Sequence, residues 1–441
     1  MFSRNGDKKT KESFMQWNAS WAMMAILFIF TGCGKAFQVS DAPTNQHFAG
    51  IIATCTTTTE ALQLAKELDG QFRVLSEEKK LIEFIGIEQK DLEKKLKRSR
   101  FIKNIVYDGL IETSSQASAQ FVDASPFTGP GTPIYRNEIS YYDFPHLAQI
   151  EAPAVPGKIA GDGVVIAIVD SGVAYNHPDL NPNILTDNLG NMIGKNFITA
   201  SAAPFDDNGH GTHVAGLAAG TRSGVAPRSK ILPVKVLNSQ GRGDIGTIAA
   251  GILYAIDQGA DIINLSLGGP AAEMMQYEVS RLLSTIKMAK TKDRLIIAAA
   301  GNGGRDELGD CNDEQPVFPA SFQEESLISV AAVDSYNNLT SYSNYGKVTV
   351  DITAPGGNGG YWGGGLFSTS NTGGYVEMSG TSMATPLVSG LAALIKSANP
   401  NLTSTDIKNI IFQTGESKRG LQDYIATGKV INVQNALDLF R

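Results

Sequence analysis

Continuous apolar runs rich in β-branched residues recur along the chain, and they constrain its fold more than any other feature. The first run, residues 164–169, reads VVIAIV and contains no polar residue that would mark an exposed face. Runs of this kind are typical of strands that are buried on both faces of a parallel sheet. Comparable runs follow at residues 230–237, 261–267, 295–300, 327–333 and 348–353.

Helical patterns lie between several of these runs, and we expect helices at residues 213–220, 245–258 and 273–290. Alternation of strand and helix predicts an α/β fold with a doubly wound, mostly parallel sheet flanked by helices and connected by right-handed crossovers. Ligands of such sheets bind at the carboxyl ends of the strands. Polar residues at those ends are therefore candidates for a functional site.

Chemically useful side chains follow the predicted strands or precede a predicted helix. Asp170 ends the first strand, Asn302 lies between two glycines after another, and His210 lies in the glycine-rich segment before a helix. Each has a structural interpretation by itself: a cap, a turn residue or a buried histidine. Together with a serine, they are the groups of a hydrolase, and they are predicted to lie at one edge of one sheet.

The candidate serine is Ser382, in the segment GTSMATP that leads into the apolar stretch 387–398. Gly380 permits a tight backbone entry, Thr381 or Ser382 can cap the helix that follows, and Pro386 suits its first turn but not its interior. Backbone N–H groups at the start of a buried helix favour a developing negative charge. The alternative is that Ser382 only caps this helix.

The first 33 residues have the plan of an export signal. Basic residues precede an apolar run at 22–30, which is shorter than the ~20 residues that span a bilayer. The run ends in FTGC, which resembles the lipobox of bacterial lipoproteins, with Cys33 as the lipidated residue. Ordinary secretion with another cleavage site is the alternative, and both interpretations predict an exported protein of the cell envelope or the extracellular space.

Composition excludes some classes of protein. The chain has three cysteines, so we expect no disulfide framework and a fold held by its core. A formal net charge of −7 argues against nucleic-acid binding. We expect a monomer.

Residues 48–112 form a separate pattern of strand, helix, strand, strand, helix and strand, which predicts a small α+β, ferredoxin-like unit. The expected strands are 49–54, 72–75, 81–85 and 102–107, and the expected helices are 59–68 and 88–99. Residues 34–47 are predicted to be a linker. Residues 113–140, rich in small residues, glycine and proline, are a second linker.

Five motifs carry a resemblance to a known family. They are DSGV at 170–173, HGTHVAG at 210–216, NLSLGG at 264–269, AAAGN at 298–302 and GTSMATP at 380–386. Across residues 141–439 the chain resembles the subtilisin-like serine proteases, or subtilases. The resemblance implies a peptidase domain at 141–441, an inhibitory propeptide at 48–112, and a processing region within 113–140. It therefore implies a serine endopeptidase made as a self-processing zymogen, with its own propeptide as an inhibitor.

The resemblance also implies a role for each residue of the site. Ser382 would be the nucleophile, His210 the general base and Asp170 the residue that orients His210, while Asn302 would bind the oxyanion. The substrate backbone would pair with one segment, Ser266, Leu267 and Gly268, and with a second, Gly241 to Gly243. Gly301 and Val317 would line the pocket for the side chain before the cut, and Val317 would limit its depth.

Calcium is a possible cofactor, since the family that this chain resembles has a tight calcium site. Asp179 matches a carboxylate of the family's tight calcium site, but the loop that completes that site has no counterpart after HVAG. A hard cation takes six to eight oxygen ligands. We therefore predict no metal site at Asp179 and no cofactor, and leave open whether the acidic stretch 305–314 binds calcium.

The sequence disagrees with two other classes of protein. An α/β-hydrolase esterase or lipase would carry G-x-S-x-G and the chain order Ser, Asp, His. This chain has the order Asp170, His210, Ser382, and Ser382 lies in GTSMA. A family member that serves only as a binding module would have lost a catalytic residue, and none is lost.

Overall fold

The computed structural model describes most of the chain. All residues that it describes belong to the unit Thr44–Arg441. They are residues 143–152, 158–303, 308–358 and 364–441, and the backbone of the strands at 48–55, 71–76, 81–85, 102–110 and 122–123.

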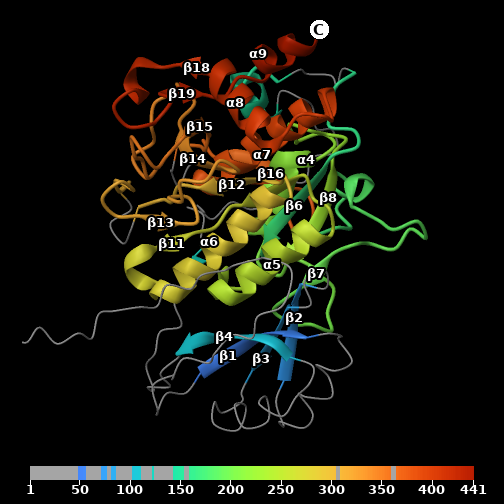
Figure 1. Ribbon diagram of the computed structural model, residues 1–441. Coiled ribbons are helices and arrows are strands. Elements are labelled where there is room, and N and C mark those ends of the chain that lie inside the picture. Colours follow the sequence, from blue (N-terminus) through green and yellow to red (C-terminus); the bar gives the residue numbers. More distant parts are fainter. Residues whose placement is uncertain are drawn as a thin grey trace, which may run out of the picture. The chain divides into compact units, whose positions relative to one another are not determined.

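A nine-stranded sheet forms the centre of the structure (Figure 1). Its neighbouring strands are parallel, except for the antiparallel edge pair of β18 and β19. This confirms the predicted doubly wound sheet. In sheet order the strands are β18 (Glu416–Ser417), β19 (Lys429–Val430), β15 (Ile352–Pro355), β14 (Leu327–Val333), β12 (Leu295–Ala299), β10 (Ile262–Leu265), β6 (Val165–Asp170), β8 (Lys230–Lys235) and β7 (Lys195–Asn196).

The last predicted strand was placed too early in the sequence. We expected it at 348–353, but β15 begins at Ile352, and Val348 is 62% exposed. The backbone N–H groups of Val348 and Thr349 donate to the carboxylate of Asp313 rather than to a neighbouring strand. The apolar residues before Ile352 therefore belong to a turn.

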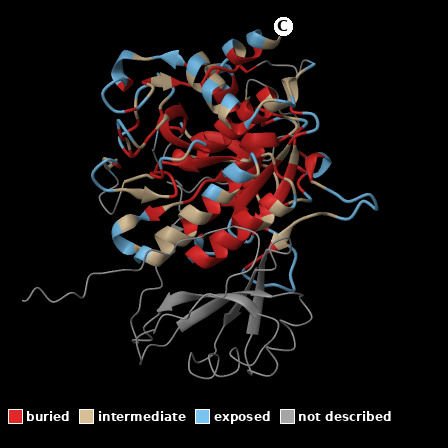
Figure 2. Cartoon of the chain, in the orientation of Figure 1, coloured by how far each residue is buried: buried red, intermediate tan, exposed pale blue. Residues whose placement is uncertain are grey.

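Helices cover both faces of the sheet, as β6 illustrates. Alternate residues of a strand point to opposite faces. Ile166 and Ile168 belong to one buried cluster with side chains of α4 (His210–Ala219) and α7 (Thr381–Ala398). Ala167 and Val169 belong to a second cluster with α5 (Ile245–Asp257) and α6 (Gln276–Thr291). The strands and the inner surfaces of these helices are buried, while the exposed residues lie on the outside (Figure 2).

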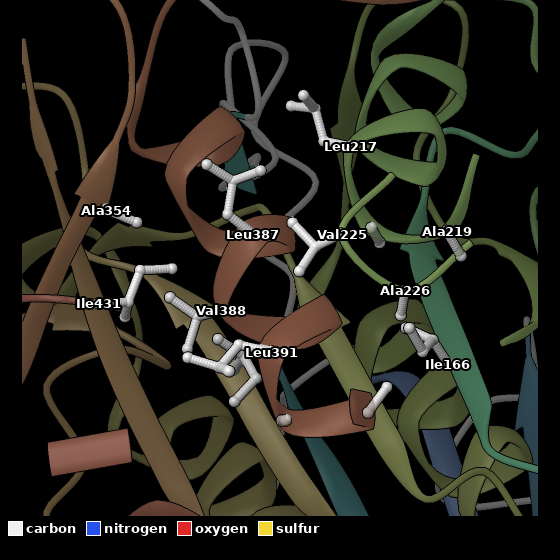
Figure 3. Packing of buried hydrophobic residues seen from close by; sticks show 14 of the residues in the cluster. Ile166, Leu217, Ala219, Val225, Ala226, Ala354, Leu387, Val388, Leu391 and Ile431 are labelled. Carbon is white, nitrogen blue, oxygen red and sulfur yellow. The ribbon is translucent and has the colours of Figure 1, made fainter. Parts of the chain in front are cut away.

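Helix α7 is deeply buried, and every residue from Thr381 to Ile395 is buried. Figure 3 shows Leu387, Val388 and Leu391 of α7 between Ile431 and Ala354 on one side and Val225 and Ala226 on the other. These contacts fix the start of the helix, where Ser382 lies.

The prediction that Pro386 lies in the first turn of α7 was wrong. The helix begins at Thr381, so Pro386 is in its interior. A proline there cannot donate to the carbonyl oxygen four residues earlier, which is that of Ser382. Another donor satisfies this oxygen, namely the hydroxyl of Ser266.

Smaller elements complete the unit. Helices α8 (Ser404–Thr414) and α9 (Val433–Leu437) pack on the same buried cluster as α7. Short α3 (Pro145–Gln149) precedes β6. Two antiparallel pairs lie outside the main sheet, namely β11 (Gly269–Pro270) with β13 (Val317–Phe318) and β16 (Leu366–Thr369) with β17 (Tyr375–Met378). None of the helices in the described part of the chain is long and apolar enough to cross a membrane.

The N-terminal strands form a sheet of their own. β1 (Phe48–Cys55), β2 (Gln71–Ser76), β3 (Leu81–Ile85) and β4 (Ile102–Leu110) are antiparallel, in the order β2-β3-β1-β4. The four predicted strands are therefore confirmed, and their order is that of a split β-α-β arrangement. The predicted helices at 59–68 and 88–99 lie outside the described residues, as do Cys33 and the rest of the predicted export signal.

Candidate active site

Asp170 and His210 form a buried pair. Asp170 is the last residue of β6, and His210 is the first residue of α4. Nδ1 of His210 lies 2.7 Å from Oδ1 of Asp170, and their side chains are 1% and 0% exposed, respectively. The backbone N–H of Ser171 donates to the same oxygen at 2.7 Å. An aspartate in this position orients the imidazole and stabilises its protonated form.

Ser382 lies at the second position of α7, next to the end of β10. Its Oγ donates to the carbonyl oxygen of Ser266 at 3.1 Å, and Oγ of Ser266 donates to the carbonyl oxygen of Ser382 at 2.8 Å. The cap of α7 is Gly380, which makes no side-chain cap bond. The alternative that Ser382 is only a cap is therefore wrong, and its hydroxyl is directed away from the helix backbone.

Asn302 follows β12 and is bound to the residue before Ser382. Its Oδ1 accepts from the backbone N–H of Thr381 at 2.8 Å and from the Thr381 hydroxyl at 2.9 Å. Because both donors hold the oxygen, the amide nitrogen is the end left to face an anionic ligand. Strands β12, β10 and β6 are adjacent and parallel, so Asn302, Ser266 and Asp170 lie at the same edge of the sheet.

At the predicted substrate-binding glycines, an added side chain would be either crowded by neighbouring atoms or strained by the backbone conformation. A Cβ on Gly268 would lie 3.0 Å from Cγ1 of Val317, and a Cβ on Gly243 would lie 2.3 Å from the carbonyl oxygen of Val236. Gly241 and Gly301 have positive φ angles of 74° and 111°. The structure thus brings Gly268 and Val317 together, beside the pairing of β11 (Gly269–Pro270) with β13 (Val317–Phe318).

Comparison with known proteins identifies this arrangement. Residues 161–429, more than half of the chain, match the pattern of the subtilase family. The chain belongs to this family. It is 38% identical to thermitase from Thermoactinomyces vulgaris over 289 residues, which cover 64% of this chain and 91% of thermitase. It is 35% identical to subtilisin BL from Lederbergia lenta over 277 residues, or 62% of this chain and 90% of that protein.

Solved structures agree with this assignment. A cold-adapted subtilisin-like serine proteinase superposes with a TM-score of 0.53 at 29% identity, covering 64% of this chain and 93% of that one. The fold also matches an epidermin leader peptide processing serine protease from Staphylococcus aureus, with a TM-score of 0.66 at 24% identity. That match covers 90% of this chain and 99% of the other. This subtilase is a serine endopeptidase with the subtilisin-like fold.

Sequence reasoning missed the carboxylate that supports His210 in this subtilase. Asp206 is 1% exposed. Its Oδ1 accepts from the backbone of Gly209 at 2.8 Å and from the hydroxyl of Ser171 at 2.8 Å, while Oδ2 accepts from the backbone N–H and the hydroxyl of Thr212. Burial raises the pKa of the Asp206 carboxyl, and these donors oppose that shift. Asp206 thereby accepts hydrogen bonds from backbone N–H groups at the start of α4, while the side chain of His210 contacts Asp170.

Lys235 is a second supporting residue that was not predicted. It ends β8 beside Asp170, and its side chain is 3% exposed. Nζ donates to the carbonyl oxygens of Ser171 and Leu237 at 2.6 and 2.7 Å and to Oδ1 of Asp207 at 2.6 Å. One ammonium group therefore joins the segment after Asp170 to the segment before His210. A lysine within an apolar run was the only signal for this role.

Asp179 has a structural function in this subtilase. It is 2% exposed. Oδ1 accepts from the hydroxyl of Thr221 at 2.6 Å and the backbone of Arg222 at 2.7 Å, and Oδ2 accepts from the hydroxyl of Ser223 at 2.8 Å. Because hydrogen-bond donors surround both oxygens, this donor set does not fit a calcium ion, which requires oxygen ligands.

The acidic stretch 305–314 is described from residue 308 onward. Its Asp313 carboxylate accepts from the hydroxyl and the backbone N–H of Thr349. These donors lower the pKa of Asp313, although burial, the largest influence, acts to raise it. Within the described residues, no three carboxylate, imidazole or thiol groups are close enough together to hold a metal ion.

Proposed function

We propose that Ser382, His210 and Asp170 are the catalytic triad of this endopeptidase. The observation that carries the proposal is the buried 2.7 Å contact between His210 and Asp170, at the sheet edge where Ser382 also lies. In the structure the Ser382 hydroxyl donates to the carbonyl of Ser266. For catalysis it would turn toward Nε2 of His210, the nitrogen on the opposite side of the ring from Asp170.

The reaction would proceed by acyl transfer. Ser382 Oγ attacks the scissile carbonyl carbon while His210 takes the hydroxyl proton. The tetrahedral oxyanion is held by the Asn302 amide and the backbone N–H of Ser382. His210 then gives the proton to the leaving amine, and water hydrolyses the acyl-enzyme by the same steps. Asp170 stabilises the protonated imidazole throughout.

The substrate would bind as an added strand between Gly241–Gly243 and Ser266–Gly268. One observation supports this mode of binding. The chain's own strand β5 (Val122–Asp123) pairs antiparallel with β9 (Arg242–Gly243), so that Val122 is opposite Gly243 and Asp123 is opposite Arg242. A segment of the predicted processing region thus pairs with a proposed substrate-binding strand. The apolar pocket formed by Gly301 and Val317 would favour an uncharged side chain before the cut.

We further propose that the protein is exported as a zymogen. Residues 48–112, with their four antiparallel strands, would be the inhibitory propeptide, and Cys33 would carry a lipid. A cut within 113–140 would then separate the lipid anchor from the catalytic domain at 141–441. Self-processing would release a monomeric peptidase from the membrane. The peptidase would stay at the membrane only while the lipid-anchored propeptide remained bound to it as an inhibitor.

The test compares wild type with Ser382→Ala in membrane and soluble fractions of the producing cell. Loss of the nucleophile is expected to lower peptidase activity by roughly 10⁶-fold. Wild type should appear as a soluble fragment of about 300 residues, and Ser382→Ala should remain full-length with the membrane. Ser397→Ala removes another serine of α7, one that binds the carbonyl of Asp162, and should behave as wild type.

Each other outcome contradicts a separate part of the proposal. Activity of Ser382→Ala within tenfold of wild type would exclude it as the nucleophile. Equal cleavage of both forms would mean that another protease performs the processing. Active enzyme that remains intact with the membrane would make residues 48–112 a permanent domain. If neither form fractionates with the membrane, Cys33 is not lipidated.

A further inference from the structure

The loop that carries Asn302 is not fixed by its own residues, because glycines flank Asn302 on both sides. Asn302 lies between Gly301 and Gly303, whose φ angles are 111° and 73°. Glycine adopts such angles readily but adds no side chain that could fix the loop. A group that stabilises a transition state must nevertheless be held within about 0.5 Å of its working position. Contacts from elsewhere in the chain must therefore hold this loop.

Asn344 holds both glycines. It lies after β14, 41 residues from Gly303, and is 2% exposed. Its Oδ1 accepts from the backbone N–H of Gly303 at 2.7 Å, and its own backbone N–H donates to the carbonyl oxygen of Gly301 at 2.9 Å. The same Oδ1 accepts from the backbone N–H of Asp310 at 3.0 Å. One buried side chain thus ties the two sides of the Asn302 loop to the segment that returns from it.

Asn312 extends this support to the strand before the loop. Its side chain is completely buried. Oδ1 accepts from Nδ2 of Asn344 at 2.9 Å, and Nδ2 donates to the carbonyl oxygen of Ala300 at 2.8 Å. A Cβ on Gly301 would lie only 2.7 Å from Nδ2 of Asn344, which explains the glycine at this position. Ala300, Gly301 and Gly303 are each bound to one of the two asparagines.

We propose that the buried pair of Asn312 and Asn344 positions Asn302 for transition-state stabilisation. The inference rests on the oxyanion role proposed for Asn302. Thr381 orients the oxygen of the Asn302 amide, while the asparagine pair fixes the backbone from which that amide projects. Both asparagines are positioning residues, since their amides bind the protein backbone and each other.

The experiment is a double-mutant cycle between Asn344→Ala and Asn302→Leu, with kcat and KM measured on a peptide amide. Asn302→Leu should lower kcat by about 10²–10³-fold with little change in KM. Asn344→Ala should lower kcat by roughly 10–100-fold, because a displaced donor retains part of its effect. In the double variant, Asn344→Ala should add less than about threefold to the loss caused by Asn302→Leu, since nothing remains to be positioned.

Two further variants separate positioning from folding. Asn312→Ala removes the tie to Ala300 without removing the bond between Asn344 and Gly303, so it should lower kcat by a smaller factor. It also serves as the test if Asn344→Ala does not fold. Asn183→Ala removes a different buried amide, which donates to the carbonyls of Ala219 and Pro227. This control should keep kcat within about twofold of wild type even if the melting temperature falls.

The outcomes distinguish the inference from the function on which it rests. Unchanged kcat in Asn302→Leu would refute the oxyanion role of Asn302 and the positioning role with it. A large loss in Asn302→Leu, together with unchanged kcat in Asn344→Ala, would refute the positioning role alone. The same conclusion would follow if Asn344→Ala lowered kcat by the same factor with and without Asn302.

Discussion

Oδ1 of Asp170 lies 2.7 Å from Nδ1 of His210, and the same oxygen accepts from the backbone N–H of Ser171. Asp170 ends β6 and His210 begins α4, 40 residues later. Both residues are held by groups that the active-site motifs do not include, namely Lys235 behind Ser171 and Asp206 beneath the first turn of α4. These contacts orient the pair without any contribution from a bound substrate.

Asp170→Asn tests this pair. The change removes the charge that stabilises protonated His210, so kcat should fall by about 10⁴-fold while KM changes little. Steady-state kinetics on a peptide amide check the prediction. Asp261→Asn, immediately before β10, changes an aspartate that binds Arg294 and the backbone of Val165, and it should retain activity. A loss below tenfold in Asp170→Asn would show that His210 does not depend on this carboxylate.

Val317→Gly tests the depth of the specificity pocket. The Val317 side chain lies against Gly268, so its removal should admit larger apolar side chains before the cut. The ratio of kcat/KM for a phenylalanine substrate to that for an alanine substrate should rise by roughly 10–100-fold. Val348→Gly, which alters an exposed valine, is the control. An unchanged ratio would place Val317 outside the pocket.

Chelation tests the prediction that stability does not depend on calcium. Because hydrogen-bond donors occupy the carboxylate of Asp179, EDTA should leave the melting temperature nearly unchanged. A fall of more than about 10 °C would indicate a calcium site elsewhere in the chain. In contrast, Asp179→Ala leaves buried donors unpaired and should lower the melting temperature by roughly 5 °C, with or without EDTA. Asp162→Ala, in an exposed ion pair with Arg228, should have little effect.

We expect the buried side chain of His146 to make the folded protein less stable in acid. It is 2% exposed, its Nε2 lies 3.4 Å from the carbonyl oxygen of Ser223, and burial lowers its pKa to about 4. Below pH ~6.5 the unfolded chain binds a proton at this residue that the folded chain does not bind, so the free energy of unfolding should decrease from pH ~6.5 to about 4. His213, whose pKa burial lowers to about 3, acts in the same direction.

Comparison with His146→Gln isolates this effect. Burial raises the pKa of Asp206 and Asp351, which stabilises the fold toward low pH and therefore opposes the histidines. That contribution is common to both proteins and cancels in the difference. Between pH 7 and 4.5 the melting temperature of wild type should fall by roughly 5 °C more than that of His146→Gln. Parallel curves would show that His146 does not cause the acid sensitivity.

The sequence by itself predicted the architecture and the chemical groups of the site. Strands such as β6, β12 and β14 were predictable because a strand buried on both faces must be apolar at every position. Asp170, His210, Asn302 and Ser382 were predictable because each belongs to a short contiguous motif. The same local reasoning failed at two places, the start of β15 and the position of Pro386. Before β15, the backbone N–H of Val348 donates to the distant Asp313 instead of to a neighbouring strand. In α7, the hydroxyl of the distant Ser266 donates to the carbonyl oxygen of Ser382, which Pro386 cannot bind.

Only the tertiary structure decided what holds these groups in position. Asn344 and Asn312 are 32 residues apart, and Lys235 lies 64 residues from Ser171, so their contacts exist only after the sheet and its loops have assembled. No periodicity or motif marks such a contact, because a hydrogen bond between side chain and backbone needs one donor and one acceptor and no particular neighbours in the sequence. Motifs in the sequence indicate the groups that we propose to react in this subtilase, whereas the positions of those groups depend on the packing of the whole chain.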